Sequence, residues 1–429
     1  MSFFKVHRYL VGQKIGSGSF SSIRLCFKSA GEHPLVAKIT SKKVAASLVD
    51  GNRIDFNEKT LSPLLCHPNI LAIHEVIEGK SQTFQISDLY EKGDLLQLLR
   101  TSGLSKQVII SIADQILAAI EYLHENHICH RDIKLENVLL TDKMGVRLSD
   151  LGLAYVTFDD KVTGKCGSYQ YVAPEVLTQR FYDGFKADIW SCGVLFFSIF
   201  SKRFPYKENE PPTNIKFDAL PADVRPLISA MLNIDPKKRP TAKECRKFDV
   251  FNSIPVRTPP YMSPFDFDVP IQHPKMDVVS RVSQLISVAP NEVNNQLSKP
   301  EPCIEKLLYY LFFQKLQSRH LFKRFKSCPI NNKKVFDTFI EKKYRAHSCA
   351  LMKAINGFLL PFNCCISTAA TLNRTIVLNQ VDDDSSASFD LVDCDDFECC
   401  ILTLTVRKEC SLFPTKLLAY LDSMFEFVG

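Results

Sequence analysis

The stretch from His130 to Asn137, His-Arg-Asp-Ile-Lys-Leu-Glu-Asn, brings three chemically capable side chains close together. The carboxylate of Asp132 can orient a hydroxyl group and accept its proton. The ammonium of Lys134 can balance negative charge on a reacting group, and the carboxamide of Asn137 can offer an oxygen to a divalent cation. A His-Arg-Asp sequence also occurs by chance in solvated loops, so its interpretation depends on the residues around it.

The elements before and after this stretch can position it. Apolar residues recur with a helical period between Ser105 and Asn126, which predicts a helix that buries one face and ends just before the loop. Ser149-Asp150-Leu151-Gly152 follows and supplies a second carboxylate. The apolar positions of the predicted helix are Ile109, Ile110, Ile112, Ala113, Ile116, Leu117, Ile120 and Leu123.

The N-terminal part predicts strands and a glycine-containing turn. Residues 9 to 38 alternate with period two, and glycines in the turn allow backbone amides to approach phosphate groups. Lys38 lies on the following predicted strand, and a buried lysine requires a partner, for which Glu58 in the helical stretch 56 to 65 is the candidate. The turn residues expected at a nucleotide are Ile15, Gly16, Ser17, Gly18, Ser19, Phe20, Ser21, Ser22 and Ile23.

Taken together, the order and spacing of these motifs resemble the eukaryotic protein kinase family over residues 9 to 253. The resemblance implies an α+β, bilobal fold with a β-rich small lobe and a helical large lobe, and it implies ATP and Mg²⁺ as cofactors. In that family the residues corresponding to Asp132, Lys134 and Lys38 carry catalysis, with Lys38 paired to Glu58. The residues corresponding to Asn137 and Asp150 hold the metal.

The same resemblance implies a hinge that binds adenine. Asp88 and Tyr90 are expected to contact the nucleotide, and Ser87 is expected to limit the depth of the adenine pocket. Because Ser87 is small, bulky adenine-site inhibitors should enter easily. Asp94 and Glu136 either contact ribose or receive a basic residue of the substrate.

Other matches imply structural roles. Glu175 and Arg239 resemble the buried ion pair of the large lobe, Asp188 resembles the residue that binds the catalytic-loop backbone, and Ser168 resembles the residue that steadies Asp132. Two departures from the family pattern are mild: Ser21 replaces a third glycine, and Leu151 replaces a phenylalanine.

The activation segment and its neighbours bear on the subfamily. Lys134 matches the Ser/Thr type, and Gly164 stands where kinases switched on by an upstream kinase place a threonine, with Thr163 out of register. These features favour the checkpoint kinase one family, in the calcium/calmodulin-dependent group, over the energy-sensing AMP-activated type. The absence of a ubiquitin-associated-like segment after the kinase domain is expected to argue the same way. A pseudokinase scaffold is a further alternative, although Lys38, Asp132 and Asp150 are all present.

The rest of the chain divides into a linker and a second domain. Residues 254 to 302 are rich in proline and polar residues, which predicts a linker that buries no core, with Ser283-Gln284 as a possible target of an upstream sensor kinase. Residues 303 to 429 resemble an α+β regulatory domain of the kinase-associated type, which restrains the kinase in that family. We expect helices at 305 to 325, 334 to 345 and 412 to 427, and strands at 374 to 381 and 400 to 406. Basic residues at 319, 323, 324 and 326 are interpreted as a solvated helix face rather than a lipid site.

Composition sets broad limits on function. The 429 residues carry a net charge of +6, too mild to indicate nucleic-acid or membrane binding. The 15 cysteines lack metal-ligand spacing and are interpreted as thiols in a reducing compartment. No secretory signal or membrane span is predicted, so we expect a soluble protein. The family resemblance implies a monomeric kinase of the nucleus, with the cytoplasm as a second location. Its partners should be protein substrates with a basic residue before the acceptor Ser or Thr.

Overall fold

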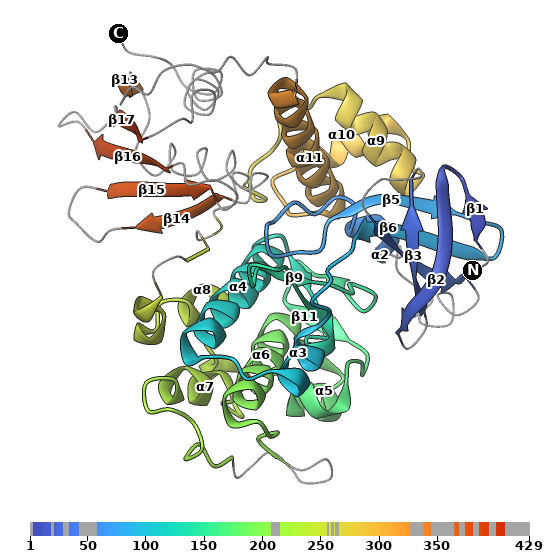
Figure 1. Ribbon diagram of the computed structural model, residues 1–429. Coiled ribbons are helices and arrows are strands. Elements are labelled where there is room, and N and C mark those ends of the chain that lie inside the picture. The colour runs from blue at the N-terminus through green and yellow to red at the C-terminus, as the bar shows by residue number, and fades with distance from the viewer. Residues whose placement is uncertain are drawn as a thin grey trace.

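The computed structural model describes residues 3–18, 21–28, 34–42, 58–206, 215–254, 257–258, 261 and 266–326. It also describes the strands over 338–344, 364–368, 374–380, 386–393 and 400–407. The side chains described extend to residue 316, apart from that of Glu58. A small lobe of strands sits against a larger helical lobe, as Figure 1 shows in blue and in cyan to green. The α+β, bilobal architecture expected from the sequence is therefore present.

The small lobe is a six-stranded antiparallel sheet with the order β1-β2-β3-β4-β6-β5. Alternation along β2, β4 and β6 turns apolar side chains such as Val11, Ala37 and Ile86 to one face, where they are fully buried. The opposite face carries Lys38, which pairs in register with Gln85 of β6. The strands are β1 (Phe4–Val6), β2 (Tyr9–Ser17), β3 (Ser21–Phe27), β4 (Leu35–Ser41), β5 (Ile73–Glu78) and β6 (Gln82–Asp88), and the short helix α2 spans Glu58–Leu61.

The large lobe is built around the buried helices α4 (Lys106–Glu125) and α6 (Gly184–Ser201). All eight apolar positions that predicted the first of these helices are buried, so that prediction is confirmed. The remaining helices are α3 (Leu95–Thr101), η1 (Leu135–Asn137), η2 (Tyr169–Tyr171), α5 (Pro174–Thr178), α7 (Arg225–Met231), η3 (Pro236–Lys238), α8 (Ala242–Cys245) and η4 (Asp249–Ser253). The short strands are β7 (Ile128–Cys129), β8 (Val138–Leu140), β9 (Val146–Leu148), β10 (Tyr155–Val156), β11 (Lys161–Thr163) and β12 (Phe181–Asp183).

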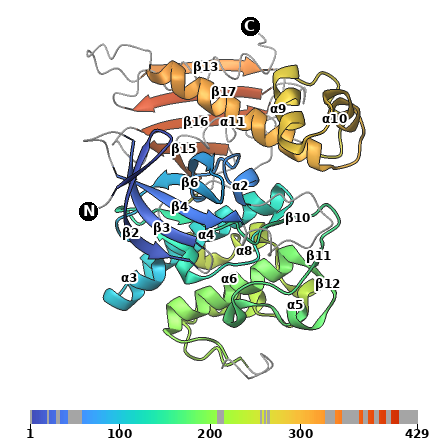
Figure 2. The ribbon, with the colours of Figure 1, turned by 90° about the vertical axis from the view of Figure 1, so that its right-hand side faces the viewer.

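Three helices follow the kinase-like part, so the prediction of a linker without a core is wrong. They are α9 (Met276–Ile286), α10 (Pro290–Leu297) and α11 (Ile304–Lys326), and Figure 2 shows them grouped together. Apolar side chains at helical spacing, such as Val279 of α9 and Val293 of α10, are fully buried. Proline content obscured this pattern, because Pro290 is in fact tolerated at the first turn of α10. We call α9, α10 and α11 the three-helix unit.

The C-terminal part contains a five-stranded antiparallel sheet with the order β13-β17-β16-β15-β14. Its strands are β13 (Thr338–Tyr344), β14 (Cys364–Thr368), β15 (Arg374–Gln380), β16 (Ser386–Asp393) and β17 (Cys400–Arg407). The strands expected near 374 and 400 are confirmed, as is the helix expected over 305 to 325. The helix expected over 334 to 345 is wrong, because the β-prone sequence Thr-Phe-Ile at the start of β13 pairs with β17. The helix expected over 412 to 427 lies outside the described residues, and the domain boundaries stay a prediction.

No helix among the described residues is long and apolar enough to cross a bilayer. The seven cysteines whose side chains are described are free thiols, and the described residues contain no cluster of metal-ligating side chains.

Candidate active site

The Asp132 carboxylate is the most heavily hydrogen-bonded group of the catalytic loop. Its Oδ2 accepts hydrogen bonds from Lys134 Nζ at 2.7 Å and Asn137 Nδ2 at 3.2 Å. Its Oδ1 accepts from Ser168 Oγ at 2.8 Å and from Ser168 N at 3.2 Å. Four donors therefore fix both oxygens, and Lys134 Nζ also donates to Ser168 Oγ at 2.9 Å. The contact from Ser168 was expected from the family resemblance, whereas the hydrogen bonds from Lys134 and Asn137 to Asp132 were not.

The backbone of this loop is held by Asp188 of α6. The two Asp188 carboxylate oxygens accept hydrogen bonds from His130 N at 2.7 Å and Arg131 N at 2.8 Å, as the sequence predicted. Arg131 has a φ of +65°, a left-handed conformation that is uncommon for a residue with a side chain. The buried Asp188 stabilises this conformation and so fixes the backbone on which Asp132 lies.

Lys38 of the small lobe contacts an acidic residue of the large lobe. Its Nζ lies 2.8 Å from Asp150 Oδ1, and Asp150 follows β9 of the large lobe. Burial alone would raise the pKa of Asp150, but the charge and hydrogen bond of Lys38 outweigh burial and lower that pKa below its ordinary value. Leu151 is buried beneath Asp150, which is the apolar role that the sequence predicted for it. The Glu58 side chain lies outside the described residues, so the expected Lys38 to Glu58 pair stays a prediction.

Asn137 and Asp150 fit a divalent cation. Asn137 Nδ2 donates to the Asp132 carbonyl oxygen at 2.7 Å, which orients the amide and leaves its oxygen as the group able to bind a metal. The pKa of Asp150 is lowered, so its carboxylate is ionised at neutral pH. Amide and carboxylate oxygens are the ligands that Mg²⁺ prefers.

The predicted phosphate-binding turn is the β2–β3 hairpin. Gly16 pairs with Ile23, Ser17 pairs with Ser22, and Gly18 N donates to the Ser21 carbonyl oxygen at 3.0 Å. A Cβ atom at Gly18 would lie 2.9 Å from Ser21 Oγ, so a larger residue there would require the Ser21 hydroxyl to move. Ile15 is exposed on the hairpin, whereas Ser19 and Phe20 lie outside the described residues.

The expected hinge lies at the end of β6. Asp88 is the last residue of that strand and binds His74 Nε2 at 2.7 Å, and this hydrogen bond lowers the Asp88 pKa. Ser87 is buried beside it, as the adenine-pocket prediction requires. Burial raises the pKa of Tyr90.

Two acidic residues expected at the ribose or the substrate lie on neighbouring elements. Asp94 caps α3 by accepting a hydrogen bond from Gln97 N at 2.8 Å, and α3 packs against η1, which contains Glu136. The Glu136 side chain is exposed. Both carboxylates thus remain candidates for contact with ribose or a basic substrate residue.

The activation segment is ordered by backbone contacts. Arg131 Nε donates to the Leu153 carbonyl oxygen at 2.7 Å, and Arg131 Nη1 donates to the Thr163 carbonyl oxygen at 3.1 Å. Strand β11 pairs with β12, and the Tyr182 hydroxyl donates to the Gly164 carbonyl oxygen at 3.0 Å. The guanidinium of Arg131 therefore donates its hydrogen bonds to carbonyl oxygens. Many kinases instead neutralise the corresponding arginine with a phosphate on the activation segment.

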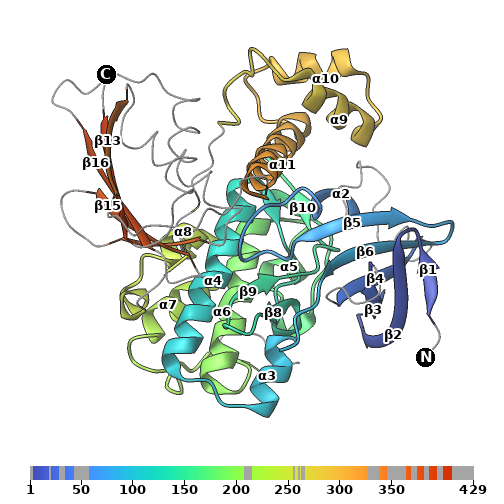
Figure 3. The same cartoon turned by 45° about the horizontal axis from the view of Figure 1, so that its top comes forward.

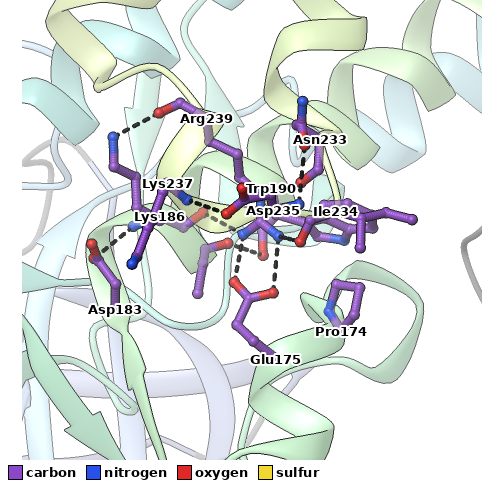
Figure 4. A network of polar contacts seen from close by, with 12 residues as sticks. Pro174, Glu175, Asp183, Lys186, Trp190, Asn233, Ile234, Asp235, Lys237 and Arg239 are labelled. Atoms are coloured by element: carbon purple, nitrogen blue, oxygen red, sulfur yellow. Dashed lines mark hydrogen bonds and ion pairs between the residues drawn. The ribbon is translucent and has the colours of Figure 1, made fainter.

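Below the site, Glu175 and Arg239 form the buried pair that the sequence predicted (Figure 4). Arg239 Nη1 and Nη2 bind the two Glu175 oxygens at 2.5 and 2.9 Å, and both side chains are almost completely buried. The Arg239 guanidinium also lies over the Trp190 ring, 4.8 Å from its centroid. The pair joins the end of the activation segment to the large-lobe core.

Sequence reasoning missed a second buried charge cluster. Arg246 Nη1 binds Glu121 at 2.6 Å, and Arg246 Nε binds Asp114 at 3.2 Å. Arg257 Nη2 binds the same Asp114 at 2.8 Å. A signal was present, because Asp114 and Glu121 are seven residues apart and so lie on one buried face of α4.

Comparison with known proteins agrees with this geometry. A family model described as "Protein kinase domain" matches residues 9–251. The carbon catabolite-derepressing protein kinase of Secale cereale is 32% identical over 268 residues, which cover 59% of this chain and 53% of that protein. A probable serine/threonine-protein kinase of Dictyostelium discoideum is 30% identical over 264 residues, covering 59% of this chain and 32% of that protein. The serine/threonine protein kinase OSK3 of Oryza sativa subsp. indica is 31% identical over 266 residues, covering 59% and 52%. The matched regions thus span about half or less of these relatives.

Proposed function

Because the chain belongs to the protein kinase family, whose members use ATP and Mg²⁺, we propose that it transfers the γ-phosphoryl group of ATP to Ser or Thr of protein substrates. The observation that carries this proposal is the set of four donors on the Asp132 carboxylate, together with Lys38 directed at Asp150. A pseudokinase scaffold would not need this arrangement of charged groups.

The residues of the chain divide the reaction between them. Asp132 orients the acceptor hydroxyl and takes its proton as the new oxygen to phosphorus bond forms. Lys134, 2.7 Å from Asp132 Oδ2, offsets the negative charge that develops on the transferred group. Lys38 would hold phosphate oxygens from the small-lobe side, and Asn137 and Asp150 would hold Mg²⁺, which neutralises phosphate charge when bound. The bond between the γ-phosphorus and the bridging oxygen of ATP breaks in the same transfer, and that oxygen leaves with ADP.

The pathway in which such a kinase acts is a finer question, and we favour the energy-sensing type over the checkpoint type. The rye relative carries the name carbon catabolite-derepressing protein kinase. A linker was expected directly after the kinase domain, so the three-helix unit at this position weakens one of the two arguments against this type. A checkpoint role was the expectation from the sequence, and neither the family match nor the names of the relatives support it.

One observation keeps the checkpoint type as a second candidate. Gly164 stands at the usual phosphorylation position, and Arg131 is already bound by carbonyl oxygens. Both favour a kinase that is competent without a phosphate on its activation segment. Nuclear residence belongs to this candidate and rests on the sequence resemblance alone. Phosphorylation of Ser283 gains no support, because that side chain is buried and its hydroxyl donates to the Val288 carbonyl oxygen at 2.6 Å.

An experiment in cells separates the two types. The chain is isolated from cells deprived of their carbon source, from cells with damaged DNA and from untreated cells, and its activity is measured on a peptide with a basic residue before the acceptor serine. The energy-sensing type predicts higher activity after carbon deprivation only. A rise after DNA damage alone would contradict it and favour the second candidate. The Asp132→Ala variant should be inactive in every sample.

A further inference from the structure

The loop between α2 and β5, residues 66–70, connects directly to the active site. Leu148 N donates to the Asn69 carbonyl oxygen at 2.8 Å, and Leu71 N donates to the Leu148 carbonyl oxygen at 2.9 Å. Leu148 ends β9, two residues before Asp150. The position of loop 66–70 therefore sets both the start of β5 in the small lobe and the approach of Asp150 to Lys38.

Two residues that follow the kinase domain contact this loop. Thr258 Oγ1 donates to Asn69 Oδ1 at 3.1 Å, and the Tyr261 ring packs edge-on against the Tyr122 ring with centroids 4.7 Å apart. Tyr122 in turn stacks on His67 at 5.0 Å, and its hydroxyl accepts a hydrogen bond from Cys66 N at 3.0 Å. Thr258 and Tyr261 are thus in contact with both ends of the loop, directly or through one ring.

Helix α11 supports these contacts through a hydrogen bond to Tyr261. Gln314 Nε2 donates to the Tyr261 hydroxyl at 3.2 Å. Figures 1 and 3 both show α11 with one end near the place where α2, β5 and α4 come together. The arrangement is anchored to the large lobe as well, since Arg257 binds Asp114 and the Thr258 amide donates to Asp114 Oδ2 at 3.1 Å.

A second series of contacts leads from α11 to Phe158 of the activation segment. Tyr310 of α11 packs edge-on against Phe267 at 5.1 Å, and Phe267 packs edge-on against His127 at 4.7 Å. His127 contacts Phe158 of the activation segment at 4.9 Å, and its carbonyl oxygen accepts from Thr157 N at 3.0 Å. Helix α11 therefore reaches the kinase domain at two places, through Tyr261 to Tyr122 and through Phe267 to His127.

We propose that Thr258 and Tyr261, backed by Gln314, are positioning residues that hold loop 66–70 and thereby keep Asp150 in place opposite Lys38. The proposal rests on the proposed kinase function. The proposed effect on activity is opposite to the restraint expected from the C-terminal domain. In the conformation described, the contacts of Thr258 and Tyr261 with loop 66–70 occur together with an assembled set of catalytic groups. The residues that position the catalytic groups of this chain accordingly extend beyond residue 253 to Thr258, Tyr261 and Gln314.

Two conservative variants of the full chain test this proposal. Tyr261→Phe removes the hydroxyl that binds Gln314 and keeps the ring, and Thr258→Val removes the hydroxyl that binds Asn69 and keeps the shape. Each removes a neutral hydrogen bond of the set that holds the loop, so each should lower kcat about fivefold, the equivalent of about 1 kcal/mol. Amide exchange at Leu71 and Leu148 should accelerate by a similar factor, and the KM for the peptide should stay unchanged.

Matched controls separate positioning from general weakening. Tyr309→Phe removes the hydroxyl that accepts from Lys275 N at 2.9 Å, inside the three-helix unit and away from the loop. Thr178→Val removes a hydroxyl that donates to the Pro174 carbonyl oxygen at 2.9 Å on α5. Both controls should keep wild-type kcat and wild-type exchange at Leu71 and Leu148.

The outcomes distinguish this proposal from the proposed function. Unchanged kcat in both test variants overturns the positioning role, and a raised kcat shows that the contact restrains the kinase. A wild-type chain without phosphoryl transfer would refute the proposed function instead. In that case the amide exchange rates still test the positioning role. Unchanged protection of the Leu71 and Leu148 amides in Thr258→Val and Tyr261→Phe would show that these side chains do not hold loop 66–70.

Discussion

Replacing Ser168 by alanine is the most informative change near the reacting groups. Both hydrogen bonds to Asp132 Oδ1 come from Ser168, from its hydroxyl at 2.8 Å and its backbone amide at 3.2 Å. The Ser168→Ala variant keeps the amide and loses the hydroxyl. It also removes one of the two acceptors of Lys134 Nζ, at 2.9 Å. The variant therefore loosens the base and the charge-balancing lysine together, without touching the β2–β3 hairpin.

The size of the effect follows from the charge on Asp132. A hydrogen bond to a charged group contributes about 1.5–3 kcal/mol. If this contribution is lost from the transition state, kcat falls about 10- to 150-fold. The KM for ATP should stay close to wild type, because Lys38, Asn137 and Asp150 keep their contacts. The fall should be much smaller than that of Asp132→Ala, which removes the base itself.

Steady-state phosphorylation of a basic peptide, with ATP and peptide varied in turn, measures both constants. Ser229→Ala is the matched control, because its hydroxyl donates only to the Pro226 carbonyl oxygen at 3.1 Å on an exposed part of α7. A Ser168→Ala kcat within threefold of wild type would refute the role given to Ser168. A large rise in the KM for ATP with unchanged kcat would likewise show that the serine acts elsewhere.

Three further predictions concern stability and the adenine pocket. Arg239→Met should lower the free energy of unfolding by about 3–5 kcal/mol, measured by denaturant titration, because it leaves the Glu175 charge buried and unpaired; a loss below about 1 kcal/mol would contradict this. Burial lowers the pKa of His67 from 6.5 to about 3, so the unfolded chain binds the proton more tightly and stability should fall as pH drops from 6.5 toward 3. The slope should approach about 1.4 kcal/mol per pH unit and flatten in His67→Gln, and an equal slope in that variant would exclude His67 as the cause. Ser87→Met should weaken bulky adenine-site inhibitors about 5- to 150-fold through overpacking, and unchanged inhibition constants would refute the small-pocket interpretation.

The catalytic groups could be predicted from the sequence because their chemistry is local. Asp132, Lys134 and Asn137 lie on one short loop, and their relative positions follow from a few backbone torsions. Asp188 and the Glu175 to Arg239 pair were predicted through family resemblance, since nothing local indicates that residues 64 positions apart meet. The lowered pKa of Asp150 needed the fold, because it depends on a lysine that approaches from another lobe.

Other features could not be predicted because tertiary contacts override composition. The prolines between 254 and 302 suggested a linker. Val279 of α9 and Val293 of α10 are nevertheless fully buried and belong to a core shared with α11. Strand β13 contains charged residues at 341 to 343 that suit a helix, and its pairing with β17 decides the conformation. Thr258 and Tyr261 carry no motif at all, so their contacts with loop 66–70 became visible only in the fold.

The most direct test of phosphoryl transfer by this chain is the initial rate at which the purified, phosphatase-treated protein labels an arrayed peptide library from ATP and Mg²⁺. Wild-type protein should label Ser and Thr peptides that have a basic residue before the acceptor. The Asp132→Ala variant should be slower by several orders of magnitude, since general-base and positioning contributions are lost together. Equal labelling by wild type and Asp132→Ala, or labelling by neither, would contradict the proposed function.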